Sequence, residues 1–190
     1  MNYIKSIYAG LVIGLGGFVY LNCDDKVIGS FLFSIGLIAV LTFGFNLYTG
    51  KVCSMEYLAK PKRLVPVWIG NLIGTLFMSM YTIGHAKTID TAKTIVENKL
   101  LKNPGVTLLD SIVCGFCIAI AVKGYVRVRN AGRYLIVILG VMVFILAGAE
   151  HCIADMFYIF CARMISLRSI VFILFVTLGN SIGGIIFCWL

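Results

Sequence analysis

Long apolar segments separated by short basic loops make up most of the chain. Runs of about 20 apolar residues have the length at which a helix crosses a bilayer. Val27–Leu58 is too long for one straight helix, and the sequence GFNLYTG at Gly44 to Gly50 predicts a break in it. The pattern predicts an all-α polytopic membrane protein, a single domain over residues 1–190 with six spans: Tyr3–Leu21, Val27–Leu58, Val65–Gly84, Val106–Val122, Tyr134–Phe160 and Ser169–Leu190.

The fifth segment is predicted to be broken as well, because it carries polar residues where a bilayer is driest. It contains AGAEHCIADMFY, which places Gly148, Glu150, His151 and Asp155 near the middle of the span. A charged side chain at that depth costs roughly 2.5–3.5 kcal/mol. Irregular backbone is tolerated there only where it is buried in protein or lines a cavity. The stretch therefore predicts a broken helix that faces a pathway through the membrane.

An internal repeat relates the two halves of the chain. SIYAGL recurs as SIVCGF, IGNLIG recurs as LGNSIG, and the two breaks fall between these markers at an offset of about 105 residues. Three helices in each half force the halves, about 1–85 and 106–190, into opposite orientation. Broken helices at matching places indicate a substrate site near the midplane. We expect the asparagines of the second marker, Asn71 and Asn180, to hydrogen-bond the broken segments.

Composition supports this interpretation and excludes other classes of protein. The chain is 61% hydrophobic and 13% charged, whereas a soluble domain has about 25% charged residues. Seven cysteines, mostly within apolar runs, argue against a disulfide framework. The first apolar run lacks a small-residue cleavage site, so we interpret it as a helix and not a signal peptide.

The charges of the loops bear on partners and orientation. A net charge of +8 is divided among short loops and forms no continuous basic face, so we expect no nucleic-acid partner. It favours attraction of small anions to the pore mouths, or of anionic lipid head groups. Nine basic residues fall on the side of the termini and seven on the other, out of 16 Lys and Arg. This bias predicts a multi-pass protein of the inner (plasma) membrane with cytoplasmic termini.

Five segments, in order, resemble the formate/nitrite transporter family: AGLVIGLGG, FSIGLIAVLTFGFNLYTG, WIGNLIG, GAEHCIADMF and TLGNSIGG. The resemblance covers nearly the whole chain, and its GxEHxxA core and LFTG-like break are specific. It implies six spans per subunit, an aquaporin-like inverted 3+3 repeat with broken second and fifth helices, and assembly into a homopentamer. Within the family, the hydrosulfide-conducting branch is the most similar.

The resemblance also implies which residues form the site. The family's central histidine corresponds to His151, with Glu150 beside it and Thr49 in the first break. Its apolar pore slits correspond to Phe33, Leu37, Leu47, Tyr48 and Phe144. The basic residues ahead of its first and fourth spans correspond to Lys5 and Lys99.

This chain departs from the formate channels of the family at three places. They carry phenylalanine where Tyr48 stands, asparagine where Asp155 stands and asparagine near Gly115. Losing an asparagine and gaining a glycine changes the polarity and width of a pore. These departures argue against formate, and the resemblance to the hydrosulfide-conducting branch makes hydrosulfide the first expected anion, with formate or nitrite as the others.

The residue types suggest how a small monovalent anion would cross. Basic mouths would concentrate the anion, and narrow apolar rings would exclude hydrated ions. His151 is the natural proton donor, because histidine titrates near neutrality. The competing interpretations are that His151 is a neutral histidine fixed by hydrogen bonds at the break, and that the apolar residues are ordinary core or lipid contacts. Glu150 is expected to brace the break by accepting hydrogen bonds from backbone N–H groups.

Other functions stay open at this point. One is a neutral small-solute pore like an aquaglyceroporin, and another is a proton-linked anion transporter. The third is a membrane thiol–disulfide enzyme based on Cys114-Gly-Phe-Cys117. A catalytic pair of this kind needs an exposed helix end, and this one lies within a predicted span, so we expect buried, inert thiols. The leading hypothesis is a channel without enzymatic activity, cofactor or metal, whose partners are a small anion and the lipid bilayer.

Overall fold

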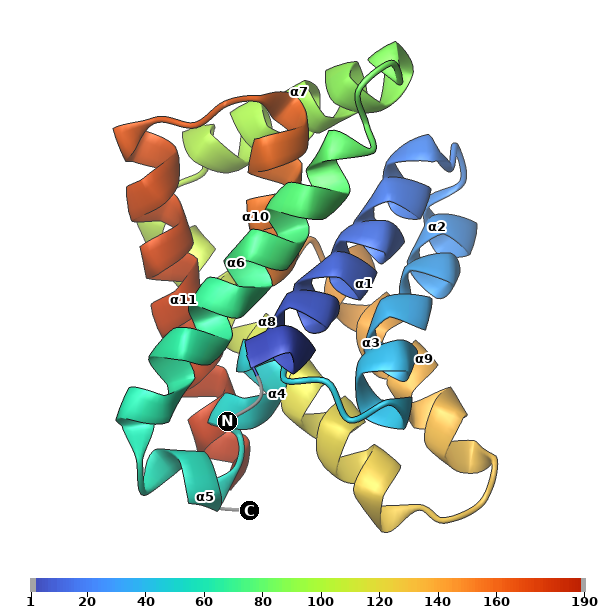
Figure 1. The fold of residues 1–190 in the computed structure, drawn as a ribbon, viewed down its shortest axis with the longest axis vertical. Helices are drawn as coiled ribbons and strands as arrows, with labels where there is room; N and C mark the ends of the chain where they lie inside the picture. The colour runs from blue at the N-terminus through green and yellow to red at the C-terminus, as the bar shows by residue number, and fades with distance from the viewer. Residues whose placement is uncertain (1–2, 189–190) are drawn as a thin grey trace.

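The computed structural model describes residues 3–188, whose regular elements are all helices. Figure 1 shows a bundle in which most of the long helices run side by side. In chain order the elements are α1 (Tyr3–Asn22), α2 (Lys26–Phe33), α3 (Ile35–Thr42), α4 (Tyr48–Val52), α5 (Met55–Leu58), a 3₁₀ turn η1 (Pro61–Arg63), α6 (Leu64–Met80), α7 (Ala86–Leu101), α8 (Pro104–Arg127), α9 (Gly132–Leu146), α10 (Cys152–Ala162) and α11 (Leu167–Cys188).

Four of the helices in the described residues are long and apolar enough to cross a membrane. They are α1, η1 with α6, α8 and α11, spanning Tyr3–Asn22, Pro61–Met80, Pro104–Arg127 and Leu167–Cys188. These helices correspond to the first, third, fourth and sixth predicted spans, with ends shifted by a few residues. Trp189 and Leu190, at the end of the predicted sixth span, lie outside the described residues.

The second predicted span is broken as expected, but the irregular backbone is shorter than Gly44 to Gly50. An apolar helix runs over Lys26–Thr42, with a turn at Ser34 that the sequence did not predict. Non-helical backbone follows, with Gly44 at φ +64°, a conformation that glycine adopts without steric cost. Helix α4 then begins at Tyr48 and already contains the last residues of the expected break.

The fifth predicted span is broken in a similar way. Helix α9 ends at Leu146, residues 147–151 are non-helical, and α10 begins at Cys152. Gly148 has φ +69° and gives this second break the same kind of left-handed residue. The irregular part is limited to the first five residues of the AGAEHCIADMFY stretch, and Asp155 lies inside a regular helix.

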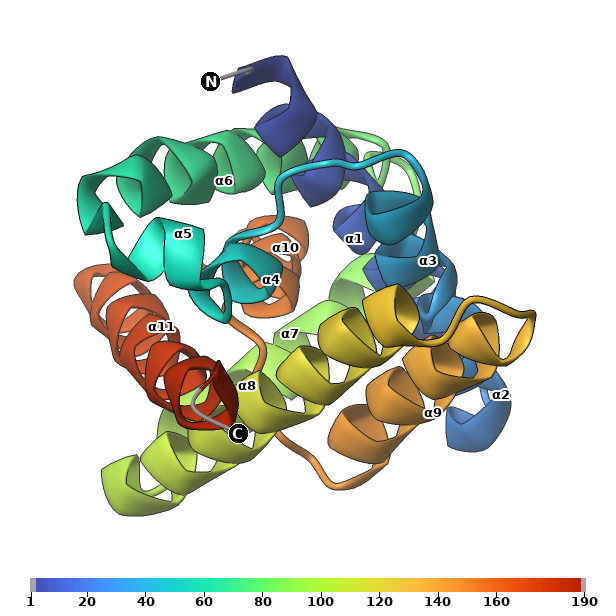
Figure 2. The same ribbon diagram turned by 90° about the horizontal axis from the view of Figure 1, so that it is seen from below.

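Helix α10 occupies the middle of the bundle and positions the second break there. Seen from below, α10 and α4 lie inside a ring formed by the longer helices (Figure 2). Every residue of α10 except Phe160 is buried. This burial explains why an 11-residue helix, too short to span a bilayer, remains regular at this position.

The sequence did not predict α7 (Ala86–Leu101). It crosses one end of the bundle and packs against α10 (Figure 1). Charged and apolar residues alternate along α7 with helical spacing, and Thr88, Ala92 and Val96 form its buried face. Because the mean hydropathy of the helix is low, a search for spanning segments does not find it. The helix carries Lys99 toward the second break.

The repeated glycines let helices in each half approach closely. A methyl group on Gly10 of α1 would overlap the backbone of Asn71 on α6, and one on Gly115 of α8 would overlap the backbone of Asn180 on α11. Gly115 thus contacts a neighbouring helix. The effect of this glycine on the width of a pore stays a prediction.

Candidate functional site

Asn71 holds the first break in place. Its amide Nδ2 donates to the carbonyl oxygens of Ser6 at 2.7 Å and Asn46 at 2.8 Å. Its Oδ1 accepts from the backbone N–H of Tyr48 at 2.8 Å, at the start of α4. The side chain is fully buried. It therefore satisfies the carbonyl of Asn46 and the N–H of Tyr48 in the interrupted segment and ties both to α1 through Ser6.

Asn180 does the same at the second break. Its Nδ2 donates to the carbonyl oxygens of Ser111 at 2.8 Å and Glu150 at 2.7 Å, and its Oδ1 accepts from the N–H of Cys152 at 2.9 Å. This side chain is also fully buried. Each of the two asparagines thus ties together an α-helix, a break and the start of a short helix.

His151 connects the two breaks. Its Nδ1 accepts a hydrogen bond from the backbone N–H of Ala154 at 3.1 Å, which makes it the N-cap of α10. Because a backbone N–H can only donate, Nδ1 carries no proton and the hydrogen is on Nε2. That Nε2–H donates to Oγ1 of Thr49 in α4 at 3.0 Å. The ring is a neutral imidazole fixed by hydrogen bonds, and it reaches from one broken segment to the other.

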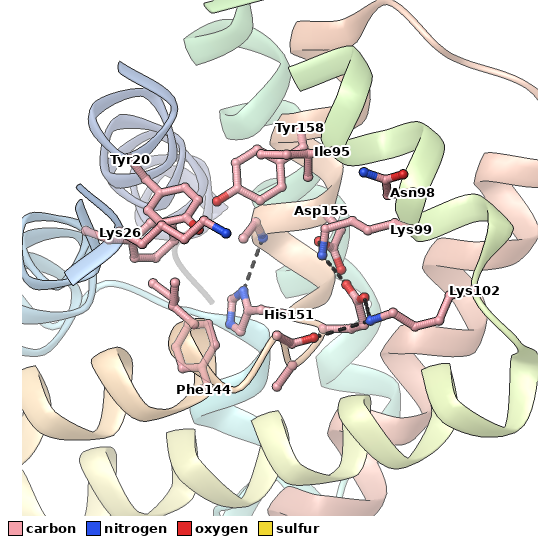
Figure 3. A pocket seen from close by; sticks show the side chains of 16 residues that line it. Tyr20, Lys26, Ile95, Asn98, Lys99, Lys102, Phe144, His151, Asp155 and Tyr158 are labelled. Atoms are coloured by element: carbon pink, nitrogen blue, oxygen red, sulfur yellow. Dashed lines mark hydrogen bonds and ion pairs between the residues drawn. The ribbon is translucent and has the colours of Figure 1, made fainter. Parts of the chain in front are cut away.

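A cavity of about 340 Å³ leads from the α7 end of the bundle to His151. Figure 3 shows the lysines of α2 and α7 around it, with His151 and Phe144 at its inner end. The rings of Phe33 and Phe144 meet edge to face, 6.3 Å between centroids, and Phe144 stacks on His151 at 5.7 Å. Two aromatic rings therefore narrow the cavity beside the histidine.

An alternating chain of charges lies along one wall of this cavity. Lys99 pairs with Glu150 and, at 3.0 Å, with Oδ1 of Asp155. Lys102 pairs with Glu150 at 2.6 Å and with Asp110 at 2.8 Å. Glu150 is fully buried, so its partners offset part of the large cost of removing a carboxylate from water. The expectation that Glu150 accepts from backbone N–H groups is wrong, because its carboxylate oxygens accept from these two ammonium groups.

The pairing shifts the pKa of both lysines, which belong to α7 and the turn after it and lie outside the four spanning helices. Burial lowers the pKa of Lys99, but Asp155 and Glu150 outweigh this effect and raise it overall. The pKa of Lys102 is also raised, because Asp110 and Glu150 outweigh the opposing effect of burial. Both groups therefore stay protonated across the physiological pH range.

We expect these ion pairs to stabilise the protein up to strongly alkaline pH. The pKa of each lysine is higher in the folded protein than in the unfolded chain, so the ion pairs contribute their full stability below the unfolded lysine pKa of about 10.4. This stability is lost as pH rises through the folded pKa. The melting temperature in detergent should therefore show no Lys99-dependent change between about pH 7 and pH 9, and a fall above about pH 10.4. Lys99→Met should lower the melting temperature at neutral pH and show a smaller alkaline fall. An identical alkaline fall in both proteins would contradict this expectation.

The structure brings most of the expected site residues together and leaves some apart. His151, Glu150, Lys99, Phe33 and Phe144 line the cavity, and Thr49 joins them through His151. The remaining expected residues are not in the lining of this cavity. Leu37 and Leu47 are buried in the core, the hydroxyl groups of Tyr48 and Ser181 are 2.9 Å apart, and the carbonyl of Lys5 accepts from Asn46 at the first break.

Three charged residues of the site were missing from the sequence analysis, and a fourth, Asp155, was noted in the broken stretch but given no role in the site. Asp155 lies one helical turn after His151, and Lys102 follows Lys99 by three residues, so both spacings were visible in the sequence. Asp110 and Lys26 gave no signal, because neither falls within a recognised motif. Lys26 lines the cavity from the start of α2.

Comparison with known proteins decides the family. The model of the formate/nitrite transporter family matches residues 2–190. The chain belongs to the formate/nitrite transporter family. It is 25% identical over 215 residues to the nitrite transporter NirC of Escherichia coli (strain K12), covering 97% of this chain and 80% of that one. It is 29% identical over 179 residues to the formate channel BtFdhC of Bacillus thuringiensis, covering 84% and 69% of the two chains.

Solved structures of the same family share the fold. A structure described as an FNT family ion channel superposes with a TM-score of 0.87 at 22% identity, covering 97% of this chain and 86% of that one. A pentameric formate channel with formate bound superposes with a TM-score of 0.82, also at 22% identity, covering 96% and 91%. The chain is thus an integral membrane protein with the helical fold of these channels.

Family membership also bears on the thiol–disulfide alternative. The characterised members named above are transporters and channels and not enzymes. Cys114 and Cys117 are free and buried in α8, and neither lines the cavity at His151. This arrangement lacks the exposed helix end that thiol exchange needs.

Proposed function

We propose that this protein is a channel for small monovalent anions, with hydrosulfide as the first candidate and formate and nitrite as the others. The observation that carries the proposal is the cavity that ends at His151 between Phe33 and Phe144. The cavity is polar at its mouth and aromatic at its inner end. Dry constrictions of this kind exclude hydrated ions but admit a small solute that sheds its water or its charge.

His151 provides the polar group at the constriction. Its Nε2–H reaches Thr49 on the other broken segment, so an anion displacing that hydroxyl would meet a ready donor. A weak-acid anion that is protonated there would continue as a neutral molecule. To donate that proton, the neutral ring must first take one up from water, and it returns to the neutral form when the anion leaves protonated. The N-terminus of α10 adds a partial positive charge at the same place. Leu37, Leu47 and Tyr48 would form the second constriction, beyond His151.

The proposal extends to the architecture. Matched asparagine bonds at Asn71 and Asn180, and matched left-handed glycines in the two breaks, support an inverted repeat of three spans in each half. The pentameric formate channel with the same fold supports a homopentamer. We place the protein in the inner (plasma) membrane with cytoplasmic termini, so that the cavity at His151 opens outward and Lys5 lies toward the cytoplasmic mouth. It needs no cofactor for this function.

The choice of anion follows the resemblance to the hydrosulfide-conducting branch. Tyr48 and Asp155 add a hydroxyl group and a charge where the formate channels have phenylalanine and asparagine, and Gly115 packs against α11. A second carboxylate beside Glu150 repels every monovalent anion, so it does not rank hydrosulfide against formate or nitrite. Because the relatives include a nitrite transporter and a formate channel, nitrite and formate are further candidates beside hydrosulfide.

Flux into liposomes that contain the purified protein tests this function. We expect hydrosulfide, formate or nitrite to enter at least about tenfold faster than into empty liposomes, and glycerol to enter no faster. The fastest anion identifies the physiological class. Glycerol entering as fast as the anions would show a neutral-solute pore, and anion uptake that follows an imposed proton gradient would show a proton-linked transporter.

A further inference from the structure

The cluster of charges beside His151 is not positive, although it contains two lysines. Lys99 and Lys102 are each shared between two carboxylates, and the chain ends in a carboxylate on both sides, at Asp155 and Asp110. Two ammonium groups thus face three carboxylates. With all five groups ionised, the cluster carries one excess negative charge and does not attract an anion.

A third lysine lines the same cavity without a partner. Lys26 stands at the first residue of α2, and Figure 3 shows its side chain reaching into the cavity beside Tyr20. It forms no ion pair with any residue between positions 3 and 188. Its charge is therefore available to a ligand in the cavity.

The acidic residues next to Lys26 are occupied elsewhere. Oδ1 of Asp25 accepts from the backbone N–H groups of Val27 at 2.8 Å and Ile28 at 2.9 Å, as the N-cap of α2. Asp24 pairs with Lys87 at 3.1 Å, and its side chain is 92% exposed. Neither carboxylate lines the cavity. Lys26 and Asp24 are both exposed and screened by salt, but only the side chain of Lys26 lines the cavity and acts on the space inside it.

We propose that Lys26 is the anion-capturing residue of this cavity, and that Lys99 and Lys102 serve to hold Glu150 and Asp155. The ligand is a small monovalent anion, and the proposal rests on the channel function above. Lys26 supplies the unpaired positive charge at the mouth that the ion-paired cluster lacks. Capture by a charge at the mouth lowers the concentration at which flux is half-saturated, and it leaves the maximal flux to the constriction at His151.

The test compares variants that lose the same charge at different places. Lys26→Gln should raise the half-saturating anion concentration by about 3- to 10-fold at low salt, with little change in maximal flux. The difference should shrink at high salt, because screening removes it. Lys93→Gln is the matched control, since Lys93 is on α7, pairs with Asp90 at 3.1 Å and does not line the cavity. Equal values for wild type and Lys26→Gln, or equal shifts in both variants, would overturn the proposal.

A variant that removes a negative charge from the cavity provides a second test. Asp155→Asn removes the excess negative charge and keeps an oxygen for Lys99, so it should lower the half-saturating concentration where Lys26→Gln raises it. Lys26→Arg, which retains the charge, should behave like the wild type. A shift of Asp155→Asn in the same direction as Lys26→Gln would contradict the electrostatic role.

A binding measurement separates this inference from the channel function. Chloride is a suitable probe, because broadening of its NMR signal reports binding to the detergent-solubilised protein without any flux. Lys26→Gln should reduce the broadening relative to Lys93→Gln, even if wild-type liposomes pass no anion. Flux in wild-type liposomes with equal broadening by both variants would reject the role of Lys26 and leave the channel function intact.

Discussion

Replacing His151 with phenylalanine is expected to lower anion flux by at least about 100-fold, because an anion then meets an aromatic constriction without a donor. The substitution removes the Nε2–H that now donates to Thr49. It also removes the N-cap of α10, where Nδ1 accepts from Ala154, at a cost of about 1 kcal/mol in stability. Flux into liposomes measures the first effect and the melting temperature in detergent measures the second, while the oligomeric mass of the purified variant checks its assembly.

His151→Asn separates the two roles of the histidine. Asparagine is among the preferred N-cap residues, so this variant should keep the stability of α10 while losing the imidazole as a proton-exchanging group. We expect reduced flux that no longer changes between about pH 5 and pH 8. Wild-type flux in His151→Phe would remove His151 from the pathway. A wild-type pH profile in His151→Asn would show that another group exchanges the proton.

Replacing Asn180 with alanine is expected to destabilise the protein by about 2–6 kcal/mol, because two backbone groups of the break lose their partners at once. The carbonyl of Glu150 and the N–H of Cys152 would lose the hydrogen bonds from Asn180 while staying buried, whereas the carbonyl of Ser111 lies inside α8 and keeps its helical partner. Each backbone group buried without a partner costs about 1–3 kcal/mol. The melting temperature in detergent should fall by about 10 °C or more.

Two further variants show whether the hydrogen bonds themselves are responsible. Asn180→Asp keeps the acceptor for Cys152 but replaces the two donated bonds with a carboxylate facing carbonyl oxygens, so it should be at least as unstable as Asn180→Ala. Asn130→Ala is the control, because Asn130 lies in the exposed turn between α8 and α9, where its Oδ1 accepts from Gly132 at 2.9 Å. It should change the melting temperature by only a few degrees. Similar losses for Asn130→Ala and Asn180→Ala would argue against the brace at the second break.

The sequence predicted well those features that a membrane imposes locally. Apolar length predicted the spanning helices α1, α6, α8 and α11, because each must cross the hydrocarbon region with its own residues. Polar and glycine residues predicted both breaks, because such residues are tolerated at that depth only beside protein or a cavity. The boundaries were less accurate. The turn at Ser34 has no signal in the apolar pattern, and the second break proved shorter than its polar stretch.

By itself, the sequence determined the helical class, the two breaks, the asparagine and glycine markers of each half and the central histidine. Only the tertiary structure decided how the charges are used. Lys99 and Glu150 are 51 positions apart in the chain, and nothing in the local pattern of either specifies a partner. Helix α7 brings them together, and it escaped prediction because its buried face is narrow. The lysines that were expected to attract anions are thus paired with carboxylates in the folded protein, because buried charges must be paired. Lys26 has no such pair and lies at the mouth of the cavity.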